Sequence, residues 1–308
     1  MSSKLVNKIV ALIRDTSSSL PPDVLKALRS SLRREKRGSS AAVVLKTIID
    51  NCAIAAKRGT PLCQDTGTLT FFVDERLRRK VTPAVIGKAV AIATEKGCLR
   101  KNTIDAVTGQ SYDDNCAPGA PVVHYVESKK GKGKSKKCGV TLILKGGGSE
   151  NMSRQYSLPD SALGAGRDLE GVRKCILDAV QKIQGYGCAP GILGVCIGGD
   201  RATGYEVAKE QLLRPLDEDC LSSRSHDCMF GCQFRQSNNQ TIQTIKQLHS
   251  LEKQLLREAN ALGIGPMGLG GKTTLLGVKI AARPRVPASF FVTIAYMCWA
   301  CRRRTVEI

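Results

Sequence analysis

Aromatic residues are scarce in this chain of 308 residues, where Phe, Trp and Tyr make up only 4% of the sequence. Proteins that bind single strands of nucleic acid without sequence preference stack the bases on aromatic side chains, so this composition does not support such a platform. Long apolar runs are missing as well. None approaches the roughly 18–20 residues that cross a bilayer, which excludes a membrane-spanning chain.

A secretory signal is also missing from the N-terminal segment, MSSKLVNKIVALIRDTSSSL. This segment has neither an uninterrupted apolar centre nor a small-residue cleavage site. We therefore expect a cytoplasmic protein. A mitochondrial location stays open, because the segment contains basic residues and serines.

Acidic residues are few compared with basic ones: 27 Asp and Glu against 47 Lys and Arg give a net charge of +20. Such a charge attracts polyanions and also small dicarboxylates. Part of it is local, because residues 128–137, SKKGKGKSKK, contain six lysines. The apolar segments PVVHYV and CGVTLIL flank this stretch, so we expect a hairpin with an exposed basic tip, and nucleic-acid binding at the tip is the alternative.

Thirteen cysteines are scattered along the chain. This distribution is unlike the dense spacing of a small disulfide scaffold, so we expect reduced thiols. Binding of a metal or an iron–sulfur cluster is therefore an open possibility.

The order of periodic segments predicts a mixed α/β fold, with a helical N-terminal section (residues 1–60) packed on a Gly-rich α/β section (residues 61–308). We expect helices over residues 23–35, 40–56, 83–96, 169–184, 202–213 and 241–262, preceded by a first helix containing Leu5, Ile9 and Leu12. We expect strands over residues 69–73, 121–126, 140–144, 192–197, 275–280 and 290–295. Residues 216–240 are polar and aperiodic, which indicates an insertion in a single domain, 1–308.

Five segments carry clusters of functional side chains, and the first four of them also contain glycine. Glycines placed in this way let the backbone approach a ligand closely and present amide donors to anionic groups. The segments are PLCQDTG, LKGGGSENMS, GYGCAPGILGVCIGGD, GIGPMGLGGKTT and YMCWACRR.

Three cysteines in these segments, Cys63, Cys188 and Cys298, lie where a strand or turn begins or ends. Three thiolates can hold an iron–sulfur cube by three corners and leave the fourth iron open. An open Lewis-acidic metal can bind a hydroxyl and a carboxylate and help to expel water from a hydroxy acid. Structural thiols are the other interpretation, because cysteines so far apart in the sequence carry no local signature.

The same segments resemble a known family. PLCQDTGT, KGGGSEN, GCAPGILGVCIGG, GIGPMGLGGKTTLLGVKI and PASFFVTIAYMCWACRR are similar, in this order, to segments of the oxygen-sensitive class I fumarate hydratases. The resemblance covers residues 40–305 and corresponds to the N-terminal domain or separate α subunit of these iron–sulfur enzymes. Tartrate dehydratase α subunits are close relatives, although the triple glycine is more like that of the fumarases.

The resemblance implies that Cys63, Cys188 and Cys298 bind a [4Fe–4S] cluster. It also implies that Gln64 and Asp65 face the open iron and its dicarboxylate substrate, and that Asp65 orients the substrate or transfers a proton. A turn-forming role is the alternative for Asp65.

For the substrate, the resemblance implies that the Arg100 guanidinium binds a carboxylate, a task that suits its planar set of donors. It further implies that Gly147 and Gly148 approach the substrate with their backbone. The alternative for Arg100 is a cation at the C-terminus of a helix.

The sequence departs from the family at Val286. The family has a histidine at this place, directly before PAS, and valine cannot transfer a proton. A smaller departure is Ala189, where the family usually has proline. The chain also ends at Ile308, without the C-terminal domain or β subunit that completes the family's active site, so a β subunit is the expected partner.

We therefore expect the α subunit of a [4Fe–4S] hydro-lyase that hydrates fumarate to malate, or acts on a related dicarboxylate such as tartrate. We expect it to function in a homo- or hetero-oligomer with a β subunit, and with no membrane contact. The alternative is a homologue that binds the cluster but is catalytically impaired by Val286 and has a regulatory or assembly role.

Overall fold

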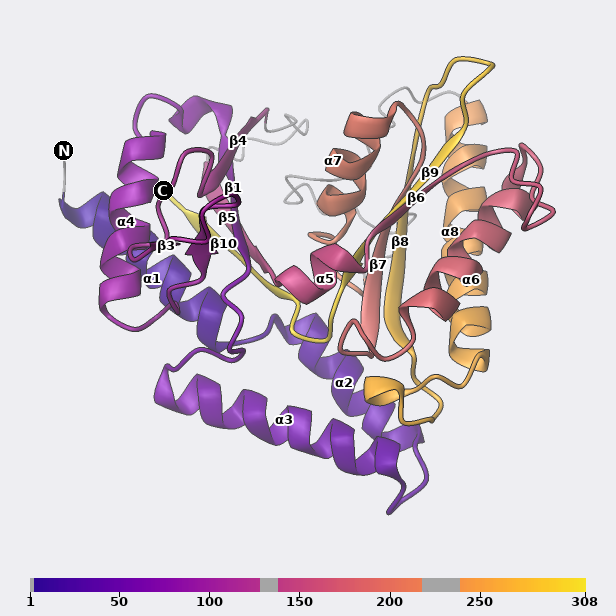
Figure 1. Ribbon diagram of the computed structural model, residues 1–308, viewed down its shortest axis with the longest axis horizontal. Coiled ribbons are helices and arrows are strands. Elements are labelled where there is room, and N and C mark those ends of the chain that lie inside the picture. Colours follow the sequence, from indigo (N-terminus) through magenta and orange to yellow (C-terminus); the bar gives the residue numbers. More distant parts are fainter. Residues whose placement is uncertain (1–2, 128–137, 218–238) are drawn as a thin grey trace. The chain divides into compact units, whose positions relative to one another are not determined.

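The computed structural model describes residues 3–127, 138–217 and 239–308, which divide into two compact units (Figure 1). The first unit contains Met1–Pro22, Ile48–Gly147 and Ala300–Ile308. The second contains Asp23–Thr47 and Gly148–Trp299. Both units therefore take residues from either side of residue 60, and the single-domain organisation stays a prediction.

The first unit is built on a four-stranded sheet in the order β10-β5-β1-β4. Strand β1 (Thr68–Asp74) runs parallel to β4 (Val122–Val126) and antiparallel to β5 (Gly139–Lys145). On its other side β5 pairs with β10 (Arg302–Glu307) in antiparallel fashion.

The expected hairpin between β4 and β5 is therefore wrong, because β1 lies between them. Every residue of β5 is buried, as suits a central strand with a neighbour on each side. The Lys-rich stretch that joins β4 to β5 lies outside the described residues.

Helices α1 (Ser3–Ser18) and α4 (Pro83–Glu95) pack in the first unit, with α1 also contacting the sheet. Their apolar faces share a core with the strands that includes Ile9, Ile86 and Phe71. The α4 helix begins where the Thr82 hydroxyl accepts from the Val85 amide and proline occupies the first turn. The unit also has short elements: the 3-10 turn η1 (Glu75–Leu77) follows β1, and the strands β2 (Thr103–Ile104) and β3 (Ser111–Tyr112) follow α4.

The second unit has a mixed sheet in the order β6-β9-β7-β8. Strand β7 (Gly191–Gly198) is parallel to β8 (Leu275–Arg283) and antiparallel to β9 (Phe291–Met297), which pairs with β6 (Arg154–Ser157). Helices α6 (Leu169–Ile183) and α8 (Asn239–Ala261) cover one face of the sheet, and α7 (Arg201–Gln211) covers the other (Figure 1).

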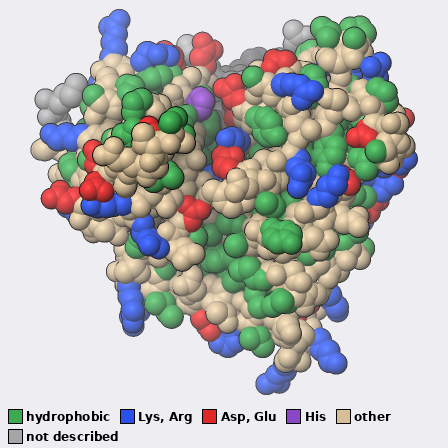
Figure 2. All heavy atoms as spheres, in the orientation of Figure 1, with side chains coloured by type: hydrophobic (Ala, Val, Ile, Leu, Met, Phe, Trp, Pro, Cys, Tyr) green, Lys and Arg blue, Asp and Glu red, His purple; other side chains and the backbone are tan. Residues whose placement is uncertain are grey.

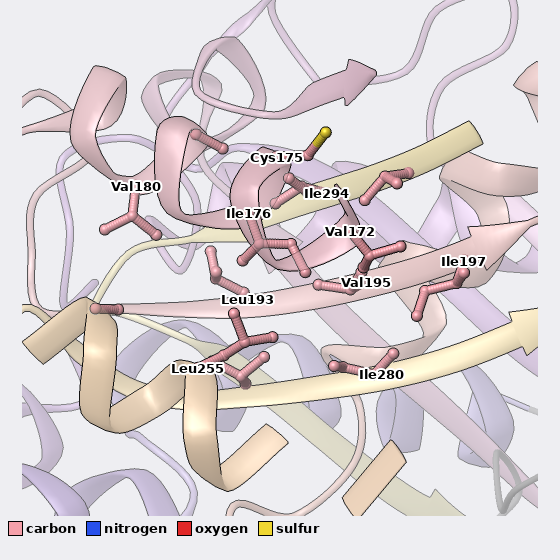
Figure 3. Close-up of a cluster of buried hydrophobic side chains, with 14 of the residues drawn as sticks. Val172, Cys175, Ile176, Val180, Leu193, Val195, Ile197, Leu255, Ile280 and Ile294 are labelled. Carbon is pink, nitrogen blue, oxygen red and sulfur yellow. The ribbon is translucent and has the colours of Figure 1, made fainter. Parts of the chain in front are cut away.

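Figure 3 shows the core of this unit, where branched apolar side chains from α6 and α8 meet those of β7, β8 and β9. Leu193 and Val195 of β7 are fully buried against Ile176 of α6 and Leu255 of α8. Burying a side chain of this size stabilises the fold by about 1.5–3 kcal/mol. The core therefore holds the strand ends in place.

The predicted helices and strands are confirmed to within three residues at either end, and so is the mixed α/β fold. Helix α2 (Pro22–Arg34) follows the prolines as expected, and α3 (Ser40–Arg58) begins where Ser39 accepts from the Ala42 amide at 3.2 Å. The sequence did not predict the strands β2, β3, β6 and β10, the short helix α5 (Gly147–Asn151), or the 3-10 turns η1 and η2 (Pro266–Gly268). Most of the predicted insertion, residues 218–238, lies outside the described residues.

None of the described helices is long and apolar enough to cross a membrane. On the face that Figure 2 draws, Lys and Arg side chains are spread over the surface, with Asp and Glu between them. The net positive charge is therefore not gathered into one patch on this face.

Candidate active site

The turn between α3 and β1, residues 59–67, carries three of the predicted site residues in a row. The Leu62 amide donates to the Ser17 carbonyl at 2.9 Å, and its carbonyl accepts from the Asn51 side chain at 3.1 Å. The Cys63 sulfur is half-buried and accepts from the Asp65 amide at 3.5 Å, while Gln64 is exposed. The turn therefore begins at a fixed point and presents the thiol and the amide side by side.

The Asp65 carboxylate joins this turn to two other segments of the first unit. Its Oδ1 accepts from the Gly67 amide and from Asn102 Nδ2, both at 2.8 Å, and its Oδ2 accepts from the Gly147 amide at 2.7 Å. A carboxylate offers about four acceptor positions, so these donors occupy most of them. Asp65 thus organises the turn, and its proposed part in substrate binding or proton transfer stays a prediction.

Two glycines are required at this junction. Gly67 has φ of 75°, and a Cβ at this position would overlap the Lys145 carbonyl. A Cβ on Gly146 would lie 2.9 Å from the Asp65 carboxylate. The glycines of PLCQDTG and KGGGSEN therefore allow the two segments to approach each other closely.

The structure places Arg100 beside the same turn. The Thr66 hydroxyl accepts from the Arg100 amide and donates to its carbonyl, with both distances 2.9 Å. The Arg100 side chain is exposed, and no carboxylate pairs with it in the part of the chain that the structure describes. A guanidinium that is free of internal partners is available to a ligand.

Sequence reasoning missed Arg302, which follows the third cysteine in the CWACRR segment. Its side chain is 2% exposed, and Nη2 donates to the Asp65 carbonyl at 2.9 Å. The Asp65 turn is therefore held from the carbonyl side as well as the carboxylate side. The only available signal was its place four residues after Cys298, because a run of arginines indicates an exposed segment.

The second unit brings Cys188 and Cys298 together. The Trp299 amide donates to the Cys188 carbonyl at 3.4 Å, and the Cys298 amide donates to the Ser149 hydroxyl at 3.1 Å. Cys188 is exposed, has φ of 53°, and lies in the turn before β7, while Cys298 is half-buried directly after β9.

The Tyr296 ring lies against the glycines on either side of the Cys188 turn. It fills the space that a Cβ on Gly187 or Gly191 would need, which explains two of the three glycines of the GYGCAPG segment. Burial, together with the nearby Cys298 and Cys188 thiols, raises the pKa of Tyr296 well above its usual value. The buried hydroxyl makes no hydrogen bond to any described residue.

These features fit an iron–sulfur cluster. Thiolates are the ligands that such clusters use, and the unpartnered Tyr296 hydroxyl is a donor that a cluster sulfide would satisfy. The predicted ligands belong to different units, with Cys63 in the first and Cys188 and Cys298 in the second. Residues 3–127, 138–217 and 239–308 contain no group of three or more His, Cys, Asp and Glu side chains that could hold a metal ion, so convergence of the three cysteines stays a prediction.

Val286 lies away from Cys298 within the second unit. It is 64% exposed in the loop between β8 and β9. This loop lies at the C-terminal end of β7, because its Pro284 carbonyl accepts from the Gly199 amide. Cys298 follows the opposite end of β9, whose seven residues span roughly 20 Å. A side chain at position 286 therefore does not reach Cys298 in the same chain.

Comparisons with known proteins identify the family. The family model described as fumarate hydratase (Fumerase) matches residues 6–307. A protein of Geobacillus stearothermophilus that is provisionally named fumarate hydratase class I is 44% identical over 313 residues; they cover 99% of this chain and 55% of that protein. The chain therefore spans only about half the length of this relative.

Two other relatives are named as separate subunits. A Methanocaldococcus jannaschii protein, provisionally named L(+)-tartrate dehydratase subunit alpha, is 31% identical over 99% of this chain and 98% of its own length. The L(+)-tartrate dehydratase subunit alpha of Escherichia coli K12 is 26% identical over 98% of this chain and 91% of its own length. The chain belongs to the fumarate hydratase family, whose named members are hydro-lyases.

Proposed function

We propose that this chain is the α subunit of a [4Fe–4S] hydro-lyase that interconverts fumarate and malate together with a β subunit. The observation that carries the proposal is the junction at Asp65, which ties the Cys63–Gln64 turn to the loop of Arg100 and to Gly147. Segments far apart in the sequence meet there, and each carries a residue that the family resemblance assigns to the substrate or the cluster.

Cys63, Cys188 and Cys298 would hold the cluster, and its open iron would supply the Lewis acidity that activates the hydroxyl leaving the substrate. The exposed Arg100 guanidinium binds one substrate carboxylate through paired, charge-assisted hydrogen bonds. The exposed backbone of Gly147 and Gly148 leaves room for the substrate to approach. Gln64 and Asp65 orient the substrate from the turn.

The β subunit is supported by the names of the two tartrate dehydratase relatives, which are called alpha subunits. The same names make tartrate a second candidate substrate. The triple glycine favours fumarate, because it is the feature in which the sequence is more like the fumarases.

The test is an anaerobic assay of the reconstituted chain with a β subunit from a relative. We expect fumarate hydration, followed as loss of the ultraviolet absorbance of the conjugated double bond, with malate as the substrate of the reverse reaction and L(+)-tartrate as the competing substrate. Turnover of none of the three by a complex with an intact cluster would contradict the proposal.

Val286 supports a second candidate, a homologue that binds the cluster but has lost activity and serves in regulation or assembly. In this case Val286→His creates activity in the reconstituted complex where the native chain has none. Equal turnover by the native chain and the Val286→His variant would dismiss this candidate.

A further inference from the structure

Asn115, between β3 and β4, is fully buried although its side chain is polar, and its backbone has φ of 61°. No family resemblance singled it out. Because a buried amide is costly unless it is hydrogen-bonded, its partners show what the position is for.

All polar atoms of the Asn115 side chain are used. Its Oδ1 accepts from the Asn102 amide at 2.8 Å and from the Thr103 amide at 3.1 Å, and the Thr103 hydroxyl lies at 3.2 Å. Its Nδ2 donates to the Arg100 carbonyl at 2.9 Å and to the Thr94 hydroxyl at 3.1 Å. The Asn115 side chain therefore fixes the backbone of residues 100–103 by accepting from two of its amides and donating to one of its carbonyls.

This loop carries two residues of the candidate active site. The Arg100 backbone is held on its other side by the Thr66 hydroxyl, and the Asn102 side chain donates to the Asp65 carboxylate at 2.8 Å. The exposed Arg100 side chain has no internal partner in the described part of the chain. The position from which it extends is therefore determined by the backbone alone.

We propose that Asn115 is a positioning residue that sets the place of the Arg100 guanidinium for a substrate carboxylate and the place of Asn102 against Asp65. The catalytic part of this inference rests on the proposed function. Asn115 does not touch the substrate. It acts through residues 100–103.

The residue type fits this role. The left-handed backbone favours Gly, Asn and Asp, and among these only Asn supplies an acceptor for the amides of residues 102 and 103 together with a donor for the Arg100 carbonyl. An aspartate would keep the acceptor and place a second oxygen against the Arg100 carbonyl.

The test compares Asn115→Gly and Asn115→Asp in the complex with the β subunit. Asn115→Gly removes the side chain without backbone strain. Asn115→Asp retains the acceptor for the amides of residues 102 and 103 but loses the donor to the Arg100 carbonyl. This variant is the one to measure if Asn115→Gly does not fold. Asn260→Ala is the matched control, because this half-buried amide of the second unit accepts from the Thr274 and Leu275 amides and donates to the Leu275 carbonyl.

We expect either Asn115 variant to raise KM for the dicarboxylate on the order of tenfold, about the loss of one charge-assisted hydrogen bond, with a smaller change in kcat. Asn260→Ala lowers thermal stability and leaves KM unchanged. In an Arg100→Ala background the Asn115 substitution raises KM less than in the native background, because the part of its effect that passes through Arg100 is already lost. An unchanged KM, or an equal further increase in the Arg100→Ala background, would overturn the inference.

Amide hydrogen exchange at residues 102 and 103 gives a readout without turnover. We expect faster exchange there in Asn115→Gly, but not in Asn260→Ala, and unchanged exchange would overturn the positioning role itself. If the native complex turns over no dicarboxylate, the proposed function fails together with the catalytic part of the inference. The exchange measurement then still decides whether Asn115 fixes the loop.

Discussion

At the scale of single residues, Asp65 connects segments that the sequence keeps apart. Asp65→Asn retains the size of the side chain but replaces an acceptor oxygen with a donor, which opposes the amides of Gly67 or Gly147. We expect faster amide exchange at both glycines and a loss of activity of about 100-fold, because small displacements of positioned groups have effects of that size. Unchanged exchange with lost activity would instead assign Asp65 to chemistry alone.

Tyr296 gives a second prediction at this scale. A buried hydroxyl without a partner costs about 1–3 kcal/mol, so Tyr296→Phe leaves the cluster-free chain at least as stable as the native one in chemical denaturation. If the proposed cluster binds and the Tyr296 hydroxyl donates to one of its sulfides, loss of that hydrogen bond would lower the reduction potential. A strongly destabilised cluster-free variant together with an unchanged potential would contradict the role given to this hydroxyl.

At the scale of secondary-structure elements, sequence periodicity was sufficient for β7 and α6, whose apolar patterns match their burial. It failed for β10, because RRRTVE has the composition of an exposed segment although Arg302 is buried. The β4–β5 hairpin failed because strand order depends on which segments meet in space.

The candidate site likewise contains residues that could be predicted from the sequence and residues that could not. The CQD turn could be predicted because its residues are consecutive. Arg302 could not, since it meets Asp65 across 237 residues of sequence. Asn115 could not be predicted either, because a buried asparagine is distinguished by its hydrogen-bond partners and these depend on tertiary contacts.

The contact between α6 and β6 makes stability depend on pH. Burial raises the pKa of Asp178, but hydrogen bonds from Lys182 and Tyr156 outweigh this effect and hold the pKa below its ordinary value. A lowered folded-state pKa adds stability above the unfolded value of about 4, and that stability is lost as the pH falls through the folded value. Asp178→Asn therefore lowers the free energy of unfolding near neutrality and flattens its decline below about pH 5. Parallel pH profiles for variant and native chain would contradict this.

At the scale of the whole molecule, the central proposal is that three cysteines, which belong to two compact units, hold one cluster. Cys63 lies in the first unit, and Cys188 and Cys298 lie in the second. Two other thiols are unsuitable as ligands, because burial raises the pKa of Cys175 and of Cys196 to about 11 and neither readily forms a thiolate. A cluster shared between the units would join them, which predicts that loading it raises the cooperativity of unfolding.

The most direct test measures iron and acid-labile sulfide per chain after anaerobic reconstitution, in the native chain, in Cys298→Ala and in the buried-thiol control Cys175→Ala. The account predicts about four of each in the native chain and in the control, and a clear loss in Cys298→Ala. Iron and sulfide that are unaffected by Cys298→Ala, or absent from the native chain, would contradict it.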